Sequence, residues 1–107
     1  MSSNSADSAS IDRFLDEPVP PSRTPYWLDW QARCREFSPD LAIPAFIEAL
    51  REGSENRQYS ALLGLRIFGF SAFAEGDGAE CTYRLRAPDG ITEEVIKPKH
   101  PPVAYEP

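Results

Sequence analysis

The spacing of apolar residues changes once along the chain, from a helical to an alternating pattern. Between residues 24 and 69, large apolar side chains recur at intervals of three and four, which is the period of an α-helix. From residue 70 onward they alternate with polar side chains, which is the period of a β-strand. Ser38-Pro39 and Gly53-Ser54 interrupt the helical part. The pattern predicts an α+β fold whose helices cover about 24–37, 40–52 and 55–68.

The alternating part predicts a three-stranded antiparallel meander that packs on these helices. Residues 79–87 alternate most regularly, and Pro88-Asp89-Gly90 suits a three-residue hairpin loop with glycine in the left-handed conformation. A loop of that length would place Arg84 opposite Glu94, which are complementary in charge. The expected strands are residues 70–75, 79–87 and 91–97.

Prolines are concentrated near the two ends of the chain. Most of the eleven lie in residues 18–25 and 98–107. Proline lacks an amide hydrogen and fixes φ, so these stretches cannot join regular backbone ladders. We therefore expect one folded domain over residues 24–97. An extended or disordered arm over 1–23 precedes it, and an extended proline-rich tail over 98–107 follows it.

Each of these end segments carries a few large apolar residues. Ile11, Phe14 and Leu15 are spaced i, i+3, i+4, which puts them on one helical face. One or two helical turns cannot bury such a face alone. It therefore packs either on its own domain or in a groove of a partner. Val103 and Tyr105 are the apolar residues of the tail, and all five are candidate partner-binding anchors.

The first long helix carries an aromatic stripe. Trp27, Trp30, Cys34 and Phe37 follow one another at steps of three, four and three. Two tryptophans on one helical turn either form a binding surface or cover the core of a small domain. Both tryptophans are therefore candidate partner-binding residues, with core packing as the alternative.

The two helices after the aromatic one match a known repeat pattern. The first carries "IPAL…AL" as Ile43-Pro44-Ala45-Phe46 and Ala49-Leu50. The second carries "R-x-A-A-x-A-L-x-x-L-G" as Arg57, Tyr59, Ser60, Ala61, Leu62, Leu65 and Gly69. Residues 42–69 thus resemble one HEAT-repeat hairpin, although the family's Asp and Val in the turn are absent and Tyr59 replaces a small residue. The resemblance implies two packed antiparallel helices. A single repeat cannot bury both its faces, so we expect the aromatic helix and the sheet to cover them.

Charge and reactive groups narrow the function classes. The net charge is −6 without a basic block, which argues against nucleic acid and anionic membrane surfaces as partners. No apolar stretch approaches the roughly 20 residues of a membrane span. Cys34 and Cys81 lie far apart and are expected to be buried reduced thiols. His100 is the only histidine and has no positioned partner nearby in the sequence. We expect neither a cofactor nor a metal.

These observations favour a small, non-catalytic protein–protein interaction protein, an accessory or adaptor subunit of a larger complex. Its partner would be a protein, and homo-oligomerisation stays open. The start "MSSNSADSAS" has neither a basic segment nor an apolar run, so we expect no secretory signal and a cytoplasmic location. The alternative is a small-molecule-binding or regulatory domain with a pocket between the aromatic helix and the sheet. A third interpretation is an enzyme of unfamiliar type.

Overall fold

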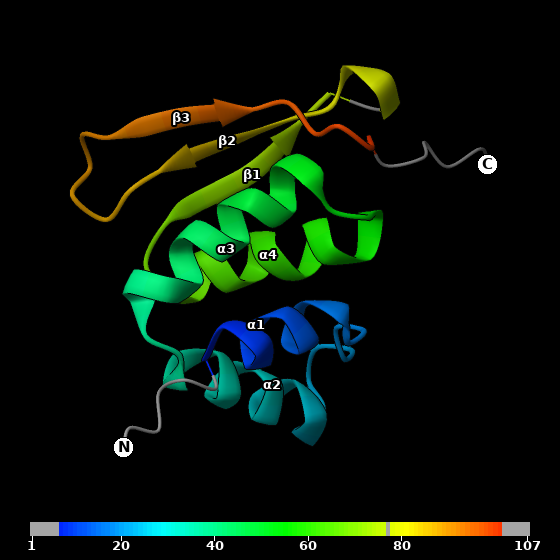
Figure 1. Ribbon diagram of the computed structural model, residues 1–107, viewed down its shortest axis with the longest axis vertical. Helices are drawn as coiled ribbons and strands as arrows, with labels where there is room; N and C mark the ends of the chain where they lie inside the picture. Colours follow the sequence, from blue (N-terminus) through cyan, green and yellow to red (C-terminus); the bar gives the residue numbers. More distant parts are fainter. Residues whose placement is uncertain (1–6, 77, 102–107) are drawn as a thin grey trace.

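The computed structural model describes residues 7–76 and 78–101. Four helices precede a small sheet, which confirms the predicted α+β class (Figure 1). The elements are α1 (Asp7–Asp16), α2 (Pro25–Glu36), α3 (Pro39–Glu52), α4 (Glu55–Ile67), β1 (Ser71–Glu75), the short 3-10 helix η2 (Gly78–Glu80), β2 (Thr82–Arg86) and β3 (Glu93–Ile96).

The α3–α4 hairpin forms the middle of three layers. The antiparallel sheet, in the order β1-β2-β3, lies on one side of the hairpin, and α1 and α2 lie on the other (Figure 1). Strand β1 contacts α4, while α1 contacts both α3 and α4. Different elements thus bury the two faces of the hairpin, as its isolation in the sequence leads us to expect.

The three predicted helices begin and end within one residue of their expected limits because short-range signals fix them. The Thr24 hydroxyl accepts a hydrogen bond from the backbone N–H of Trp27 (3.2 Å), and Pro25 occupies the first position of α2. The Ser54 hydroxyl accepts one from the N–H of Arg57 (3.4 Å) at the start of α4.

The predicted extended arm over 1–23 is wrong for residues 7–16, which form α1. Ile11, Phe14 and Leu15 are only 1%, 2% and 1% exposed, because they pack on the rest of the domain. The apolar face thus packs on its own domain, which is the first of the two alternatives. These three side chains are part of the core and are not free to anchor a partner.

A column of aromatic rings joins the helices. Phe14 stacks on Trp30 with ring centroids 4.9 Å apart, and Trp30 in turn stacks on Trp27 at 5.4 Å. On its other side Phe14 approaches Phe46 (6.4 Å), which contacts Phe68 (6.0 Å). This aromatic column links α2, α1, α3 and the C-cap of α4. Phe14 is the residue through which α1 joins the column.

The sheet has the predicted strand order and alternation but a different register, and the strand expected over 79–87 is shorter because residues 78–80 form η2. Arg84 lies opposite Val95, and Glu94 lies opposite Leu85, so the expected pairing of Arg84 with Glu94 is wrong by one residue. The loop covers residues 88–91 because the Asp89 carboxylate accepts hydrogen bonds from the N–H groups of Ile91 and Thr92 (2.8 and 2.9 Å). The shift places Ile96 rather than Val95 on the buried face.

Replacing Phe14 with alanine tests whether α1 belongs to the core. We expect Phe14→Ala to lower the free energy of unfolding by about 3–5 kcal/mol, because it removes the central ring of the column. Urea denaturation followed by circular dichroism measures the change. The control Leu28→Ala, at a residue that is 66% exposed, should stay within about 0.5 kcal/mol of wild type. A similarly small effect of Phe14→Ala would contradict the packing of α1.

Gly64 allows α3 and α4 to approach closely, and its substitution gives a second test. A Cβ atom there would lie 2.5 Å from Cε2 of Phe46. Helix propensity alone would make Gly64→Ala stabilising by about 1 kcal/mol. We instead expect a net destabilisation of about 1–3 kcal/mol from overpacking. The penalty should shrink in a Phe46→Leu background, where the smaller side chain makes room; equal penalties in both backgrounds would refute the contact.

Candidate functional site

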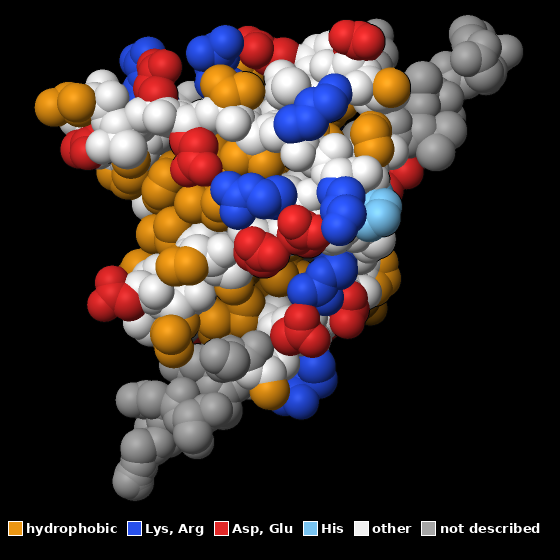
Figure 2. All heavy atoms as spheres, turned by 45° about the horizontal axis from the view of Figure 1, so that its top comes forward, with side chains coloured by type: hydrophobic (Ala, Val, Ile, Leu, Met, Phe, Trp, Pro, Cys, Tyr) orange, Lys and Arg blue, Asp and Glu red, His pale blue; other side chains and the backbone are white. Residues whose placement is uncertain are grey.

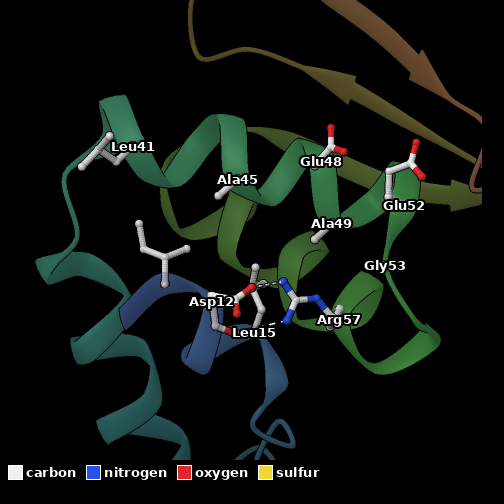
Figure 3. A pocket seen from close by; sticks show the side chains of 10 residues that line it. Asp12, Leu15, Leu41, Ala45, Glu48, Ala49, Glu52, Gly53 and Arg57 are labelled. Carbon is white, nitrogen blue, oxygen red and sulfur yellow. Dashed lines mark hydrogen bonds and ion pairs between the residues drawn. The ribbon is translucent and has the colours of Figure 1, made fainter. Parts of the chain in front are cut away.

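A hollow lies between α1 and α3, with Arg57 of α4 in its wall (Figure 3). Its volume is about 380 Å³. We call it the α1–α3 groove. Its apolar lining consists of Ile11, Leu15, Leu41, Ala45 and Ala49, and its charged lining of Asp12, Glu48, Glu52 and Arg57.

Small residues on α3 account for the groove. Leu41, Ala45 and Ala49 are spaced four apart, so they form one stripe along the helix. The two alanines are too short to fill the space that separates α3 from α1. The bulky residues of α3, Phe46 and Leu50, are fully buried in the core instead. The groove is therefore a consequence of side-chain size on one helical stripe.

Arg57 fastens α1 to the start of α4 along one wall of the groove. Its Nη2 donates to Asp12 Oδ1 (2.7 Å) and its Nη1 to Asp16 Oδ1 (2.6 Å). Burial alone would lower the pKa of Arg57, but the hydrogen bonds that it donates to Asp16 and Asp12 raise it overall. Asn56 adds hydrogen bonds to the carbonyl oxygens of Leu15 (3.4 Å) and other residues at the end of α1. These contacts satisfy backbone acceptors that a helix end leaves unpaired.

The groove carries excess negative charge. The positive charge of Arg57 is already compensated by Asp12 and Asp16. Glu48 and Glu52 project from α3 on the side away from that cluster (Figure 3). Glu48 pairs with Arg51 (3.4 Å), and Glu52 pairs with Lys99 of the tail (3.5 Å). Both glutamates are well exposed, so these pairs are weak and open to exchange.

Several large apolar side chains remain exposed outside the core. Figure 2 shows hydrophobic side chains gathered at the left of one face, beside a band of intermixed acidic and basic side chains. Leu41, at the mouth of the α1–α3 groove, is 42% exposed. The other exposed large apolar residues are Tyr26, Leu28, Tyr59, Phe73, Ile91 and Val95.

The candidate anchors predicted from the sequence differ in how far their side chains are exposed. Trp30 is fully buried in the aromatic column and offers no surface. Trp27 is half-buried, with one ring face on Trp30 and the rest near the surface. Ile11 and Leu15 contribute to the groove wall although they are nearly inaccessible. Val103 and Tyr105 lie outside the residues that the structure describes.

Within residues 7–76 and 78–101 the aromatic helix does not face the sheet, as the expected pocket between them would require. The α3–α4 hairpin lies between α2 and the sheet and fills that space (Figure 1). The sequence could not order these layers, because the stripe on α2 fits either side of the hairpin equally well.

Both cysteine thiols lie in the core. Burial raises the pKa of Cys34 to about 12, so this thiol is not a nucleophile near neutral pH. Cys81 is also buried as a free thiol. Within residues 7–76 and 78–101, no group of three His, Cys, Asp or Glu side chains is placed to hold a metal ion. No helix in this part of the chain is both long and apolar enough to cross a membrane.

The residues that form the groove were not identified from the sequence. The spacing of Leu41, Ala45 and Ala49, with Glu48 and Glu52 beside them, is a visible amphipathic signal. It is equally typical of a solvent-exposed helical face. What makes it a groove is the position of α1 across it, and this depends on contacts such as that between Asp12 and Arg57, 45 residues apart.

A buried glutamine holds the start of the tail on the core. Gln58 donates through Nε2 to the carbonyl oxygens of Gly53 (2.9 Å) and His100 (2.6 Å). Its Oε1 accepts a hydrogen bond from the hydroxyl of Tyr83 (2.7 Å), whose pKa is raised by burial. The N–H of Lys99 also donates to the carbonyl of Arg51 (2.8 Å). The chain bends at Lys99 and His100, and these two residues are fixed on the turn between α3 and α4.

Comparison with protein-family models, with curated proteins and with solved structures finds no match to this chain. The site is therefore interpreted from its own residues.

Removing the Gln58 amide tests the tail contact. Gln58→Leu leaves the Tyr83 hydroxyl and the His100 carbonyl without their partner, and we expect a loss of about 1–3 kcal/mol in unfolding free energy. Trypsin should also cleave faster after Lys99 in the folded variant. The only other glutamine, Gln31, is half-exposed, and Gln31→Leu should change neither quantity appreciably. Unchanged cleavage in Gln58→Leu would show that the tail is held by other contacts.

Proposed function

We propose that this protein is a small, non-catalytic interaction protein that binds a segment of a larger protein in the α1–α3 groove. The observation that carries the proposal is the groove itself, with its apolar floor, its exposed Leu41 and its carboxylate-rich rim. A role as an accessory or adaptor subunit of a larger complex follows from the small size of the domain.

The chemistry of the groove indicates what its occupant looks like. The floor accepts apolar side chains, and a helix presents them at i, i+3/i+4 and i+7 on one face. The lining holds three carboxylates against one arginine that is already paired twice. Complementary charge steers association and fixes orientation. The occupant is therefore a short amphipathic helix with apolar anchors and flanking Lys or Arg residues.

The proposal has two further parts, the location of the protein and its kinship. A cytoplasmic location is supported by the two free cysteines, since disulfides are rare in reducing compartments. Kinship of residues 42–69 with HEAT repeats is supported by the α3–α4 hairpin. Here α1 and the sheet would take the places of neighbouring repeats.

A charge at the mouth of the groove tests this function. Helical peptides are selected from a display library on the wild-type protein, and their affinities are measured by fluorescence polarisation for Leu41→Asp and Leu28→Asp. We expect Leu41→Asp to weaken binding at least tenfold, about 1.4 kcal/mol. Leu28→Asp, at an exposed site on α2, should bind like wild type. Because the rim is acidic, the selected peptides should be basic and should bind more weakly at higher ionic strength.

The same variants apply to the natural partner. A protein recovered from native lysate with wild type and Leu28→Asp, but lost with Leu41→Asp, would support the groove as its binding site. Loss with Leu28→Asp alone would place the interface on α2 and refute the groove. Peptides that bind Leu41→Asp as tightly as wild type, or that carry no basic residues, would also refute it.

A further inference from the structure

A second hollow, away from the α1–α3 groove, is lined by basic rather than acidic side chains. It lies between α2 and α4 and has a volume of about 360 Å³. We call it the α2–α4 cleft. On α2 it is lined by Trp27, Gln31 and Arg35, which are spaced four apart, and on α4 by Leu63, Arg66 and Ile67. It thus combines apolar walls with two arginines, and its size is within the range of small-molecule sites.

The two arginines of the cleft are free to bind an anion. Within residues 7–76 and 78–101, neither Arg35 nor Arg66 takes part in an ion pair, and Arg13 and Arg23 also lack one. The other five arginines are paired: Arg33, Arg51, Arg57, Arg84 and Arg86. Both lie in the last turn of their helix, where the helix dipole stabilises a cation without a carboxylate partner.

Arg66 is also held in place. Its Nε donates to the carbonyl oxygen of Ala72 (2.7 Å), which orients the guanidinium and leaves its terminal nitrogens available. Guanidinium groups bind carboxylates through paired hydrogen bonds. The two arginines without ion-pair partners make this cleft locally positive, although the protein has a net charge of −6.

Trp27 provides a rigid, flat wall. Its ring lies nearly parallel to that of Trp30, with an angle of 8° between the planes, and Trp30 is fully buried against Phe14. Its backbone N–H is capped by Thr24 (3.2 Å). A side chain fixed from behind and at its backbone loses little freedom when a ligand packs against it.

We propose that the α2–α4 cleft binds a small organic carboxylate with a flat or branched apolar body. Arg35 and Arg66 hold the carboxylate, and Trp27, Leu63 and Ile67 contact the apolar body. A monoanion fits better than a phosphate dianion, because the overall negative charge of the protein opposes a dianion more strongly. This site is separate from the α1–α3 groove and does not depend on the function proposed for it.

The two tryptophans of the chain make the site directly observable. Only Trp27 and Trp30 give indole N–H signals in a ¹⁵N-resolved NMR spectrum. Titration with 2-naphthoate should shift the Trp27 signal saturably, with a Kd below about 1 mM. The neutral analogue 2-naphthamide should bind at least about tenfold more weakly, because it cannot form ion pairs.

Charge-removing variants complete the test. Arg35→Gln should weaken 2-naphthoate binding at least about tenfold. The matched control is Arg13→Gln, since Arg13 is an exposed arginine in the last turn of α1, and it should bind within about twofold of wild type. Circular dichroism confirms that both variants are folded. The proposal is overturned if Arg35→Gln binds like wild type, if 2-naphthamide binds as tightly as 2-naphthoate, or if no saturable shift occurs up to about 10 mM.

Discussion

The stacking of Phe14 on Trp30 is the contact on which the rest of the structure depends. The α3–α4 hairpin has two apolar faces, and the sheet can cover only one of them. The other face needs α1 and α2, and these two helices meet through the Phe14 and Trp30 rings, 4.9 Å apart. The same ring of Phe14 is in edge contact with Phe37 (5.3 Å) and lies beneath the guanidinium of Arg33 (5.6 Å). One side chain therefore completes the core and positions helices that line the α1–α3 groove and the α2–α4 cleft.

The α1–α3 groove and the α2–α4 cleft are lined by side chains of opposite charge. The α1–α3 groove has carboxylates on its rim, and its arginine is neutralised by two aspartates. The α2–α4 cleft has two arginines that lack carboxylate partners within the described part of the chain. Both hollows border elements of the same helical layer. A protein this small can thus present sites of opposite polarity without a second domain, because each helix exposes a different stripe to each neighbour.

Local signals were enough to predict the elements, and long-range contacts decided the rest. Caps such as Thr24 and Ser54 act over three residues, so the limits of α2 and α4 could be found from the sequence. Where Ile11, Phe14 and Leu15 pack could not be predicted, because a short apolar face gives no information about what covers it. The hairpin register failed for a similar reason, since the Asp89 side chain rather than the Pro-Asp-Gly pattern sets the loop length. The groove and the cleft depend on layer order, to which the sequence gives no direct clue.

The way α1 is attached has a consequence for the dynamics of the molecule. Within the described residues no backbone–backbone hydrogen bond joins α1 to another element. Its polar contacts include Asn56 with Leu15 and Arg57 with Asp12, which are 41 and 45 residues apart in the sequence. Detachment of α1 must break the Phe14–Trp30 stack, so its amides would exchange with solvent only in openings that also expose the core. Detachment would remove one wall of the α1–α3 groove. Any ligand of that groove and the docking of α1 are therefore thermodynamically linked, and each stabilises the other by the same coupling free energy.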